Sequence, residues 1–308
     1  MDKMQLPYTT QTPFQAFSTL GFFTGILQAQ GHCFDGILAN RNKHIVFYRE
    51  DIFLQNYGYI RDNAFERTDL KIPLDNILPY LKQCILRGYY IDLYLNERFI
   101  KNQRAFQSHN FKHEYMIFGF DNETQTFDVA GYYGTTKRTL RVEQIPYDMM
   151  EQAIRTMPEA THTLPDVEFA YLYRVKEGYR DERIRKRMVK WQIWAYLHPI
   201  LSFWDIAVYD LYIEHTSSKK RDHIDSRTLR FFYEAKYATW LALRLCESEF
   251  ADEYEEKVTK HAHALLYLAI KYNLTKNEKL VDRFCERVKT IKEDEQRILK
   301  QFLREHIR

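Results

Sequence analysis

The sequence predicts an α+β fold over residues 1–178, followed by an all-helical domain over residues 179–308. Up to Gly178, short runs rich in aromatic and β-branched residues alternate with turn signals and helical segments, and beyond it every segment has helical periodicity. Aromatic residues reach 16%, whereas the 308 residues include only 10 glycines and 8 prolines. This composition excludes disordered, collagen-like and low-complexity classes, and the length favours two medium-sized domains.

The first region opens with a predicted buried helix over residues 13–28. Thr12 and Gln15 have the spacing of a capping box, and a proline occupies the first helical position. A second helix is predicted over residues 74–86, and it ends before Gly88, where a left-handed residue can close the last turn.

Five strands are predicted after these helices, because each run is rich in aromatic and β-branched residues and is bounded by turn residues. Short connections between the middle three predict an antiparallel meander, with the leading helix packed against one face of the sheet. The predicted strands cover residues 89–95, 115–120, 126–132, 138–142 and 168–175.

The second region reads as five helical stretches separated by polar or proline-containing segments. No period of 20–50 residues recurs, so a helical bundle is predicted rather than a solenoid. The predicted helices cover residues 181–197, 203–214, 225–247, 252–272 and 276–306.

Charge and apolar patterning exclude several partner classes. The formal net charge is only +3, and no basic stripe with interleaved aromatic residues occurs, so nucleic acid is not a predicted partner. No apolar run has the length of a membrane span, and no export signal is visible. We therefore expect a cytoplasmic protein with neither nucleic acid nor a membrane as partner.

Missing motifs also exclude common cofactor chemistries. The four cysteines are scattered and never form a CxxC pair, which argues against a zinc site or a disulfide framework. The glycines form neither a GxGxxG nor a P-loop pattern, and HExxH and GxSxG are missing. We therefore expect no cofactor and no bound metal.

One arrangement points to catalysis. His113 begins an apolar strand, and the next strand along the chain carries Asp128. Cys-His-Asp enzymes pair a histidine and an acidic residue on neighbouring strands, and a leading helix supplies the nucleophile at its amino terminus. The alternative interpretation is that His113 is only a polar residue at the start of a strand.

Three segments carry a resemblance to a known family: residues 113–121 (HEYMIFGFD), 127–132 (FDVAGY) and 145–150 (IPYDMM). They resemble the papain-like amino-terminal domain of the butirosin biosynthesis protein H family, especially its divergent relatives encoded beside nonribosomal peptide synthetases. The resemblance spans most of the chain. It implies a papain-like fold and transfer of an acyl group from a carrier-protein thioester to an amine, so an acyl or peptidyl carrier protein, a synthetase and a small-molecule amine are the implied partners.

The identity of the nucleophile stays open between two alignments. The family places a cysteine at the start of the first long helix, where this chain has residues 14–17 and Ser18 lies more than a turn deeper in the predicted helix. The nucleophile is then lost, which leaves a binding or scaffold protein. In the other alignment Cys33 begins the helix, and Gln28 donates to the oxyanion. Asp128 is the third member of the triad, although the relatives carry their acidic residue two or three positions later.

The resemblance extends into the helical half through an Asp-x-Arg, Glu-x-Lys, Arg pattern. We interpret these residues as a buried or semi-buried ion-pair network joining the helical part to the sheet, with substrate binding as the alternative. Arg227 and Glu234 are seven residues apart and align on one helix face. The pattern comprises Asp225, Arg227, Glu234, Lys236 and Arg244.

The resulting functional hypothesis is an accessory protein of natural-product assembly, of the nonribosomal peptide or aminoglycoside type. It would be an acyltransferase or thioesterase-like enzyme with His113, Cys33 and Asp128 as its catalytic residues. The alternative is a catalytically silent papain-like scaffold. Whether the chain is an enzyme therefore depends on the nucleophile.

Overall fold

The computed structural model contains helices and an antiparallel sheet, which confirms the predicted α+β class. The chain groups into two compact units, the first of residues 1–33 and 60–180 and the second of residues 34–59 and 181–308. The structure describes residues 1–15, 18–33, 35–36, 45–48, 51–54, 59–135, 138–157, 170–181, 183, 185–199, 205–217 and 223–305.

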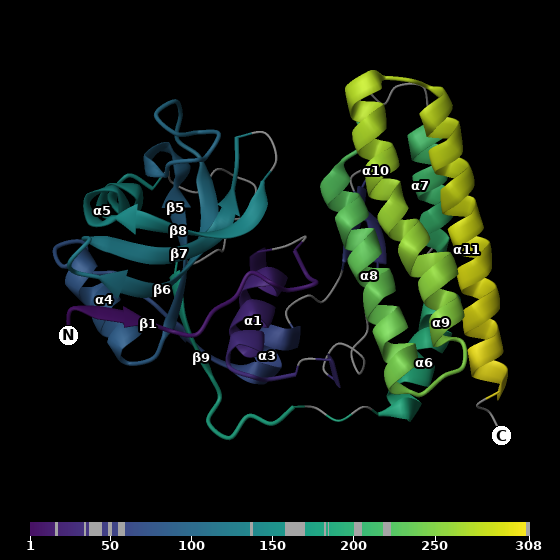
Figure 1. The fold of residues 1–308 in the computed structure, drawn as a ribbon, viewed down its shortest axis with the longest axis horizontal. Coiled ribbons are helices and arrows are strands. Elements are labelled where there is room, and N and C mark those ends of the chain that lie inside the picture. Colours follow the sequence, from purple (N-terminus) through teal and green to yellow (C-terminus); the bar gives the residue numbers. More distant parts are fainter. Residues whose placement is uncertain are drawn as a thin grey trace. The chain divides into compact units, whose positions relative to one another are not determined.

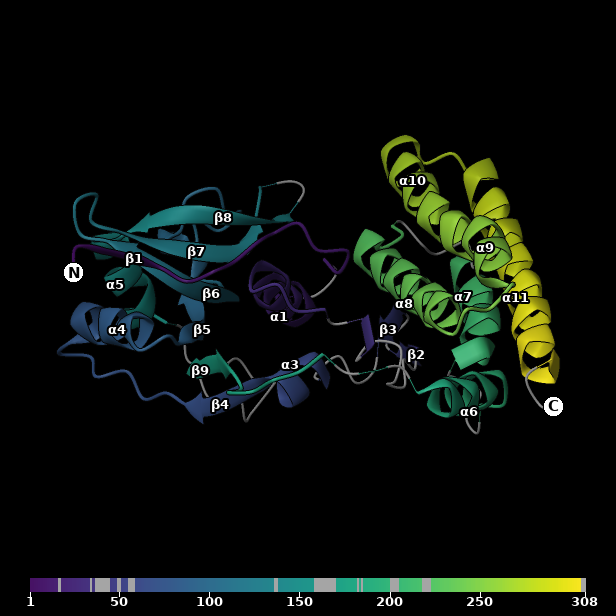
Figure 2. The same ribbon diagram turned by 60° about the horizontal axis from the view of Figure 1, so that its bottom comes forward.

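An antiparallel sheet forms the centre of the first unit. Within the described residues its strands run in the order β4, β9, β5, β6, β7, β8, and β1 pairs with the far half of β6 (Figures 1 and 2). The strands are β1 (Lys3–Gln5), β4 (Phe65–Asp69), β5 (Tyr90–Asn96), β6 (Lys112–Asp121), β7 (Thr126–Tyr133), β8 (Thr139–Pro146) and β9 (Ala170–Val175).

The predicted meander is confirmed, because β6, β7 and β8 pair in sequence. β5 to β9 overlap the five predicted strands, although β6 begins three residues earlier than predicted. The sequence analysis missed β1 and β4. β1 has only three residues, and β4 reads Phe-Glu-Arg-Thr-Asp, a polar strand without a clear apolar alternation.

Helices cover both faces of this sheet. α1 contacts β6 and β7 from one face. On the other face, Tyr147 at the start of α5 packs its ring 4.8 Å from that of Phe127 in β7, and Lys82 of α4 lies over the Phe120 ring of β6. The helices of this unit are α1 (Ser18–Ala29), α3 (Tyr59–Ala64), α4 (Ile77–Leu86) and α5 (Tyr147–Arg155).

The first helix begins at Ser18 rather than at the predicted residue 13. The Thr12 hydroxyl lies 2.6 Å from the hydroxyl of Thr24 inside the helix and also accepts from the Phe14 backbone N–H. Gln15 turns back to the Thr10 and Thr12 carbonyls. The capping-box residues therefore build a turn ahead of the helix, and Ser18 lies in the first helical turn instead of deeper.

Two glycines let α1 pack closely against its neighbours. A Cβ atom at Gly21 would lie 2.8 Å from the Leu140 side chain of β8, and one at Gly25 would lie 2.3 Å from the Thr9 carbonyl oxygen. Larger side chains at these positions would push α1 away from the sheet and from the segment before it. The position of Ser18 over the sheet depends on this close approach.

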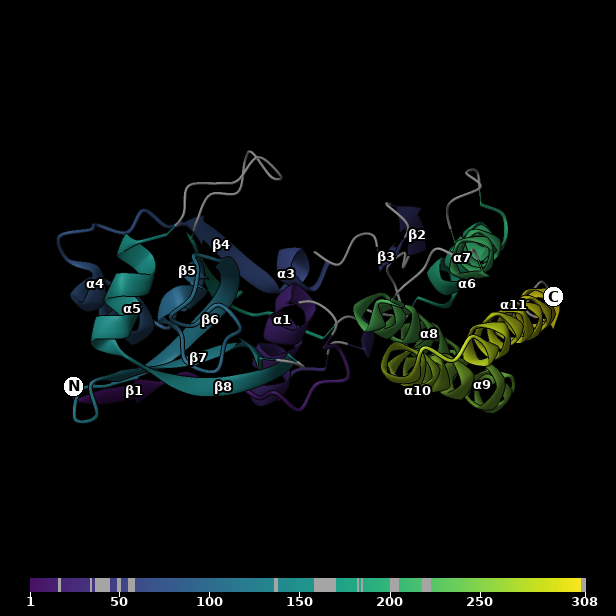
Figure 3. The same ribbon diagram turned by 90° about the horizontal axis from the view of Figure 1, so that it is seen from above.

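Within the described residues, the second unit contains helices and a hairpin. α8 and α10 pack together, as do α10 and α11 and α7 and α11 (Figure 3). The elements are β2 (Ile45–Tyr48), β3 (Asp51–Leu54), α6 (Lys186–Leu197), α7 (Val208–Ser217), α8 (Ser226–Leu245), α9 (Ala251–Tyr254), α10 (Lys260–Thr275) and α11 (Lys279–Glu305).

The predicted division at residue 178 differs from the observed grouping. The chain returns to the second unit near residue 181, close to the prediction, but residues 34–59 also belong to that unit. The Ile45 backbone N–H donates to Asp205 at 3.1 Å, and β3 packs beside α8. The amino-acid composition of residues 34–59 does not differ clearly from that of the segments on either side. A continuous first domain was therefore predicted.

A buried polar network ties the helices of the second unit together. Glu295 of α11 is fully buried and accepts hydrogen bonds from the Lys236 ammonium of α8 at 3.0 Å and from the Tyr196 hydroxyl of α6 at 2.8 Å. The hydroxyls of Tyr209 in α7 and Tyr254 in α9 donate to the same carboxylate. One carboxylate therefore links five helices.

The predicted ion-pair network is built differently. Lys236 is buried and ion-paired, but with Glu295 rather than with a residue of the predicted pattern. Arg227 reaches Asp225, which caps its own helix, and is mostly exposed. Glu234 pairs with Arg230 at 3.1 Å. Lys236 and Glu295 therefore join two helices of the second unit, and Glu234 also pairs with a residue one turn away in its own helix.

No helix within the described part of the chain is both long and apolar enough to cross a bilayer.

Candidate active site

The amino terminus of α1 meets the first half of β6. Ser18, the first residue of α1, donates its hydroxyl hydrogen bond to the Glu114 carboxylate of β6. Both side chains are half-buried. A hydroxyl and a carboxylate are therefore paired at the start of the first long helix.

Strand alternation places a second carboxyl beside Glu114. Tyr94 lies opposite Glu114 across the β5–β6 pair, and Asp92 lies opposite Met116. Asp92 and Glu114 are therefore diagonal neighbours on the face that α1 covers. Their carboxyl groups are hydrogen-bonded to each other, and Asp92 is only 6% exposed.

Burial changes the acidity of both carboxyl groups. Burial raises the pKa of Asp92 well above its ordinary value, and the neighbouring Glu114 charge raises it further. Burial also raises the pKa of Glu114, whereas the hydrogen bonds from Ser18 and Asp92 lower it. Of the two carboxyl groups, Asp92 therefore has the greater tendency to take up a proton, and the Glu114 carboxylate accepts the hydrogen bond from Ser18.

Nearby cations and the helix terminus also act on the site. The Arg61 guanidinium of α3 opposes the effect of burial by lowering the pKa of Asp92 and of Glu114. The first backbone N–H groups of a helix have no intrahelical partners, and its amino terminus favours negative charge. The Tyr132 hydroxyl donates to the Gln15 carbonyl at 2.5 Å and holds the segment just before α1. An anion beside Ser18 would therefore meet the positive potential of the helix terminus.

His113 lies next to Glu114 in β6 but on the opposite face of the strand. Its half-buried ring lies 6.3 Å from that of Phe111, stacked at 25°, and 6.0 Å from that of Tyr115 at a steeper angle. Its Nδ1 lies 3.3 Å from the Glu114 carbonyl oxygen. Glu114, rather than His113, is the β6 residue that reaches the start of α1.

Asp128 lies farther along the sheet. It pairs with Gly119 across the β6–β7 ladder, six residues from His113, which corresponds to about 20 Å of strand. Gln144 is its hydrogen-bond donor at 3.4 Å, and burial raises its pKa. A Cβ atom at position 119 would lie 2.4 Å from the Asp128 carboxylate, so glycine makes room for this side chain. The structure does not bring Asp128 and His113 together.

Cys33 is exposed and follows the carboxyl end of α1. The His32 backbone N–H donates to the Leu27 carbonyl at 2.9 Å, which fixes this segment at the end of the helix. α1 has 12 residues, a length of about 18 Å, and Ser18 lies at its other end. Cys33 is therefore not brought to the β6 segment that holds His113. The short helix predicted to begin at Cys33 lies partly outside the described residues.

The sequence analysis missed Asp92 and Glu114 and placed Ser18 too deep in its helix. A usable signal was present, because both acidic residues occupy core-facing positions of apolar strands. Unpaired carboxylates are rarely buried, so such positions indicate a proton-sharing or functional pair. Ser18 was missed only because the start of the helix was set five residues too early.

No protein-family model and no curated protein matches this chain. No group of three or more His, Cys, Asp or Glu side chains is placed to hold a metal ion in the part of the chain that the structure describes. The chemistry of the site therefore has to be judged from the side chains of Ser18, Glu114 and Asp92 themselves.

Proposed function

We propose that the first unit is a papain-like acyl-transfer unit in which Ser18 acts as the nucleophile. The observation that carries this proposal is the chain of hydrogen bonds from Ser18 to Glu114 to Asp92 at the start of α1. A helix followed by an antiparallel sheet supports the papain-like assignment. Ser18 then stands at the start of the first long helix, where the family pattern has cysteine, and Glu114 takes the role of base in place of the neighbouring His113.

The chemistry needs two steps. The Ser18 oxygen attacks the acyl carbon of a thioester, Glu114 accepts the hydroxyl proton, and the carbon–sulfur bond breaks as Glu114 returns that proton to the leaving thiol. An amine or a water molecule then attacks the acyl carbon of the Ser18 ester, and Glu114 takes a proton from the attacking group. The bond between the acyl carbon and the Ser18 oxygen breaks as Glu114 returns that proton to the oxygen, which restores the serine hydroxyl. The products are a thiol and an amide or a free acid.

The residues suit this task for electrostatic reasons. Burial raises the pKa of Glu114 toward the range in which a carboxylate is an effective base. Protonated Asp92 orients Glu114 and keeps it from turning away from Ser18. The amino terminus of α1 offers positive potential to the oxyanion that forms on the acyl carbonyl.

The resemblance supplies the proposed substrates and setting. A carrier-protein thioester would be the acyl donor, and a small-molecule amine the acceptor. The chain would then be a cytoplasmic accessory protein of nonribosomal peptide or aminoglycoside-type assembly, with a carrier protein or synthetase as its partner. In this proposal a helical domain over residues 179–308 accompanies the catalytic unit.

Turnover of an acyl-N-acetylcysteamine thioester tests the proposal through the rate of thiol release. Ser18→Ala and Glu114→Gln should each lower that rate by about 10²-fold or more, because one removes the nucleophile and the other the base. Ser108→Ala, an exposed serine in the same unit, is the matched control and should keep the wild-type rate. Loss of activity in Cys33→Ser instead of Ser18→Ala would assign the reaction to the thiol and contradict the proposal.

A second function has its own supporting observation. Phe14 is only 1% exposed and fills the turn ahead of α1, close to where a substrate acyl group would have to approach Ser18. A catalytically silent papain-like scaffold would keep this filled turn and bind its partner without chemistry. That function would be indicated by the absence of turnover in the wild type together with binding of an acyl-loaded carrier protein that Ser18→Ala leaves unchanged.

A further inference from the structure

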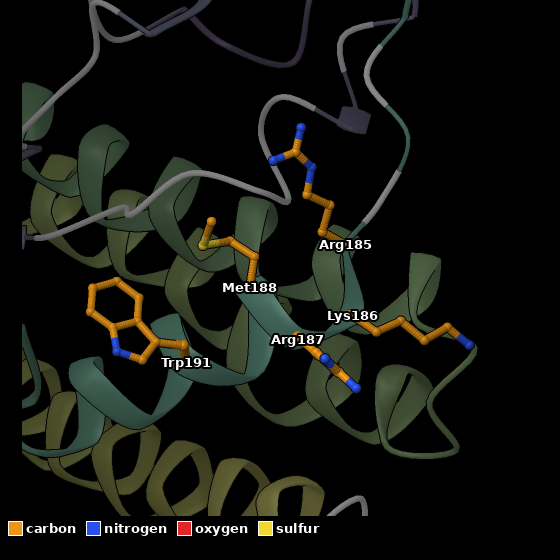
Figure 4. A pocket seen from close by; sticks show the side chains of 5 residues that line it. All are labelled: Arg185, Lys186, Arg187, Met188 and Trp191. Atoms are coloured by element: carbon orange, nitrogen blue, oxygen red, sulfur yellow. The ribbon is translucent and has the colours of Figure 1, made fainter.

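Helix α6 of the second unit presents cationic and aromatic side chains to solvent. An open hollow of about 510 Å³ at its amino terminus is lined by Arg185, Lys186, Arg187, Met188 and Trp191, which we call the α6 patch (Figure 4). Figure 4 shows Met188 and Trp191 directed to the same side of the helix, while Lys186 points to another. The hollow is therefore lined by two apolar side chains, those of Met188 and Trp191, and by three cationic ones.

We propose that the α6 patch docks the acidic face of a protein partner, one that presents aspartate and glutamate side chains around an apolar side chain. This proposal is independent of acyl transfer at Ser18. Its basis is the charge of the patch, the kinds of residue that line it, and the face of α6 that remains accessible.

The charge of this segment is strongly biased. Residues 180–190 contain six arginine or lysine residues and two acidic residues, whereas the whole chain has a net charge of only +3. The first turn of α6 holds no acidic residue, and no side chain caps it. The helix terminus adds its own positive potential to these cations, so an acidic partner would complement the patch over its whole width.

The apolar part of the patch has the composition of an interface. Trp191, and Trp194 one turn later on α6, are each 53% exposed, which is costly for a side chain of this size in water. Tryptophan, arginine and methionine are enriched in the cores of protein interfaces and supply many of their strongest contacts. A partner that covers Trp191 and Met188 would remove this apolar surface from water.

The buried face of α6 argues against a membrane as the occupant. Val189, Ile193 and Leu197 form the apolar stripe of the helix, and all three are buried in the second unit. A helix that lies on a membrane inserts its apolar stripe among the lipids, and this stripe is already occupied. Nucleic acid would call for a longer basic surface than one end of one helix provides.

The ion pair between Lys186 and Glu247 can be replaced by an ion pair between Lys186 and the partner. Lys186 lies 3.3 Å from Glu247, and both side chains are exposed to solvent. Ion pairs of this kind contribute little to stability, because water and salt screen them. A carboxylate of the partner can therefore replace Glu247 at Lys186 with little cost to the fold.

The test uses the full chain and a fluorescein-labelled helical peptide with glutamates around a central row of leucines. A peptide with glutamine in place of every glutamate is the matched ligand control. We expect the acidic peptide to bind at least about tenfold more tightly by fluorescence anisotropy, with affinity falling as salt rises. Lys186→Glu combined with Arg187→Glu should weaken binding about tenfold or more, and so should Trp191→Ala.

A second pair of substitutions controls for total charge. Lys289→Glu combined with Lys300→Glu changes the same number of charges at exposed positions of α11 and should leave peptide binding near the wild-type value. Circular dichroism confirms that each variant is folded. Equal loss in both double variants, no preference for the acidic peptide, or tighter binding to phosphatidylglycerol vesicles or a DNA oligonucleotide would overturn the proposal.

Discussion

In the proposed reaction Glu114 is the base for Ser18, and Asp92 lies beside Glu114 in the sheet. A serine hydroxyl is a weak nucleophile until a base takes its proton. Glu114 can act as that base only while it is ionised, and burial raises the pKa of Asp92 more than that of Glu114, so Asp92 takes up a proton more readily. At the scale of single residues, the site therefore depends on which of two neighbouring carboxyl groups is protonated.

Asp92→Asn tests the raised pKa of Asp92 through stability. Burial raises the pKa of Asp92 well above its ordinary value of 3.8, so the folded chain holds a proton that the unfolded chain releases. The unfolding free energy of the wild type should therefore fall as pH rises from about 4 toward the raised pKa, by up to about 1.4 kcal/mol per pH unit from this group. Asp92→Asn removes this titration, so its unfolding free energy should fall less steeply in urea titrations between pH 4.5 and 8.

Asp75→Asn provides the matched control, since this aspartate is exposed in the same unit. Its unfolding free energy should follow the wild-type pH dependence. If the Asp92→Asn and wild-type curves run parallel across this range, Asp92 does not hold an extra proton in the folded chain, and the description of the pair is wrong.

Among the secondary-structure elements, the strands of the meander were predicted from the sequence, whereas the start of α1 was not. The meander from β6 to β8 was predicted because turn residues separate strongly apolar runs. The start of α1 was misplaced, because Thr12 and Gln15 have the spacing of a capping box but bond to Thr24 and to nearby carbonyls. Local spacing shows which bonds a side chain can make, whereas tertiary packing selects among them.

The network between α8 and α11 shows the same limit. The sequence marked Lys236 as a member of an ion-pair network, but its partner Glu295 lies 59 residues away in another helix. Nothing in the spacing along the chain connects the two. Glu295 also gathers three tyrosine hydroxyls, whose pKa values burial and its own charge raise well above normal.

Removal of one partner should show how much this network contributes to the free energy of unfolding. Lys236→Met should lower the unfolding free energy by about 3–5 kcal/mol, because it leaves the Glu295 carboxylate buried without its cation. Adding Glu295→Gln to Lys236→Met should cost less than the sum of the two single losses, since the uncompensated charge is then gone. Urea unfolding of the two single variants and the double variant measures this coupling.

Arg227→Met is the control on the same helix, because Arg227 is mostly exposed and pairs with Asp225 at the surface. Its effect should stay within about 0.5 kcal/mol. An equal loss for Arg227→Met and Lys236→Met, or strictly additive losses at Lys236 and Glu295, would show that burial of the pair does not set its energy.

At the scale of the whole molecule, the sequence predicted the α+β class and a change of character near residue 178. It did not predict that residues 34–59 group with the second unit, because the hairpin that carries Ile45 lies between two segments of the first unit. The sequence also predicted His113, Cys33 and Asp128 as one site. In the structure, His113 and Asp128 lie on opposite faces of the sheet, and Cys33 follows the end of α1 that is opposite to Ser18. Asp92 and Glu114 are neighbours on one face of the sheet, and such a pair can be identified only when the register between the two strands is known.

Covalent trapping of Ser18 tests whether this residue is the nucleophile. An alkyl fluorophosphonate reacts irreversibly with an activated serine, and peptide mapping by mass spectrometry identifies the modified residue. We predict one adduct on the wild-type chain, located at Ser18, absent from Ser18→Ala and formed much more slowly in Glu114→Gln. An unmodified Ser18, or labelling at the same rate in Glu114→Gln, would contradict the account.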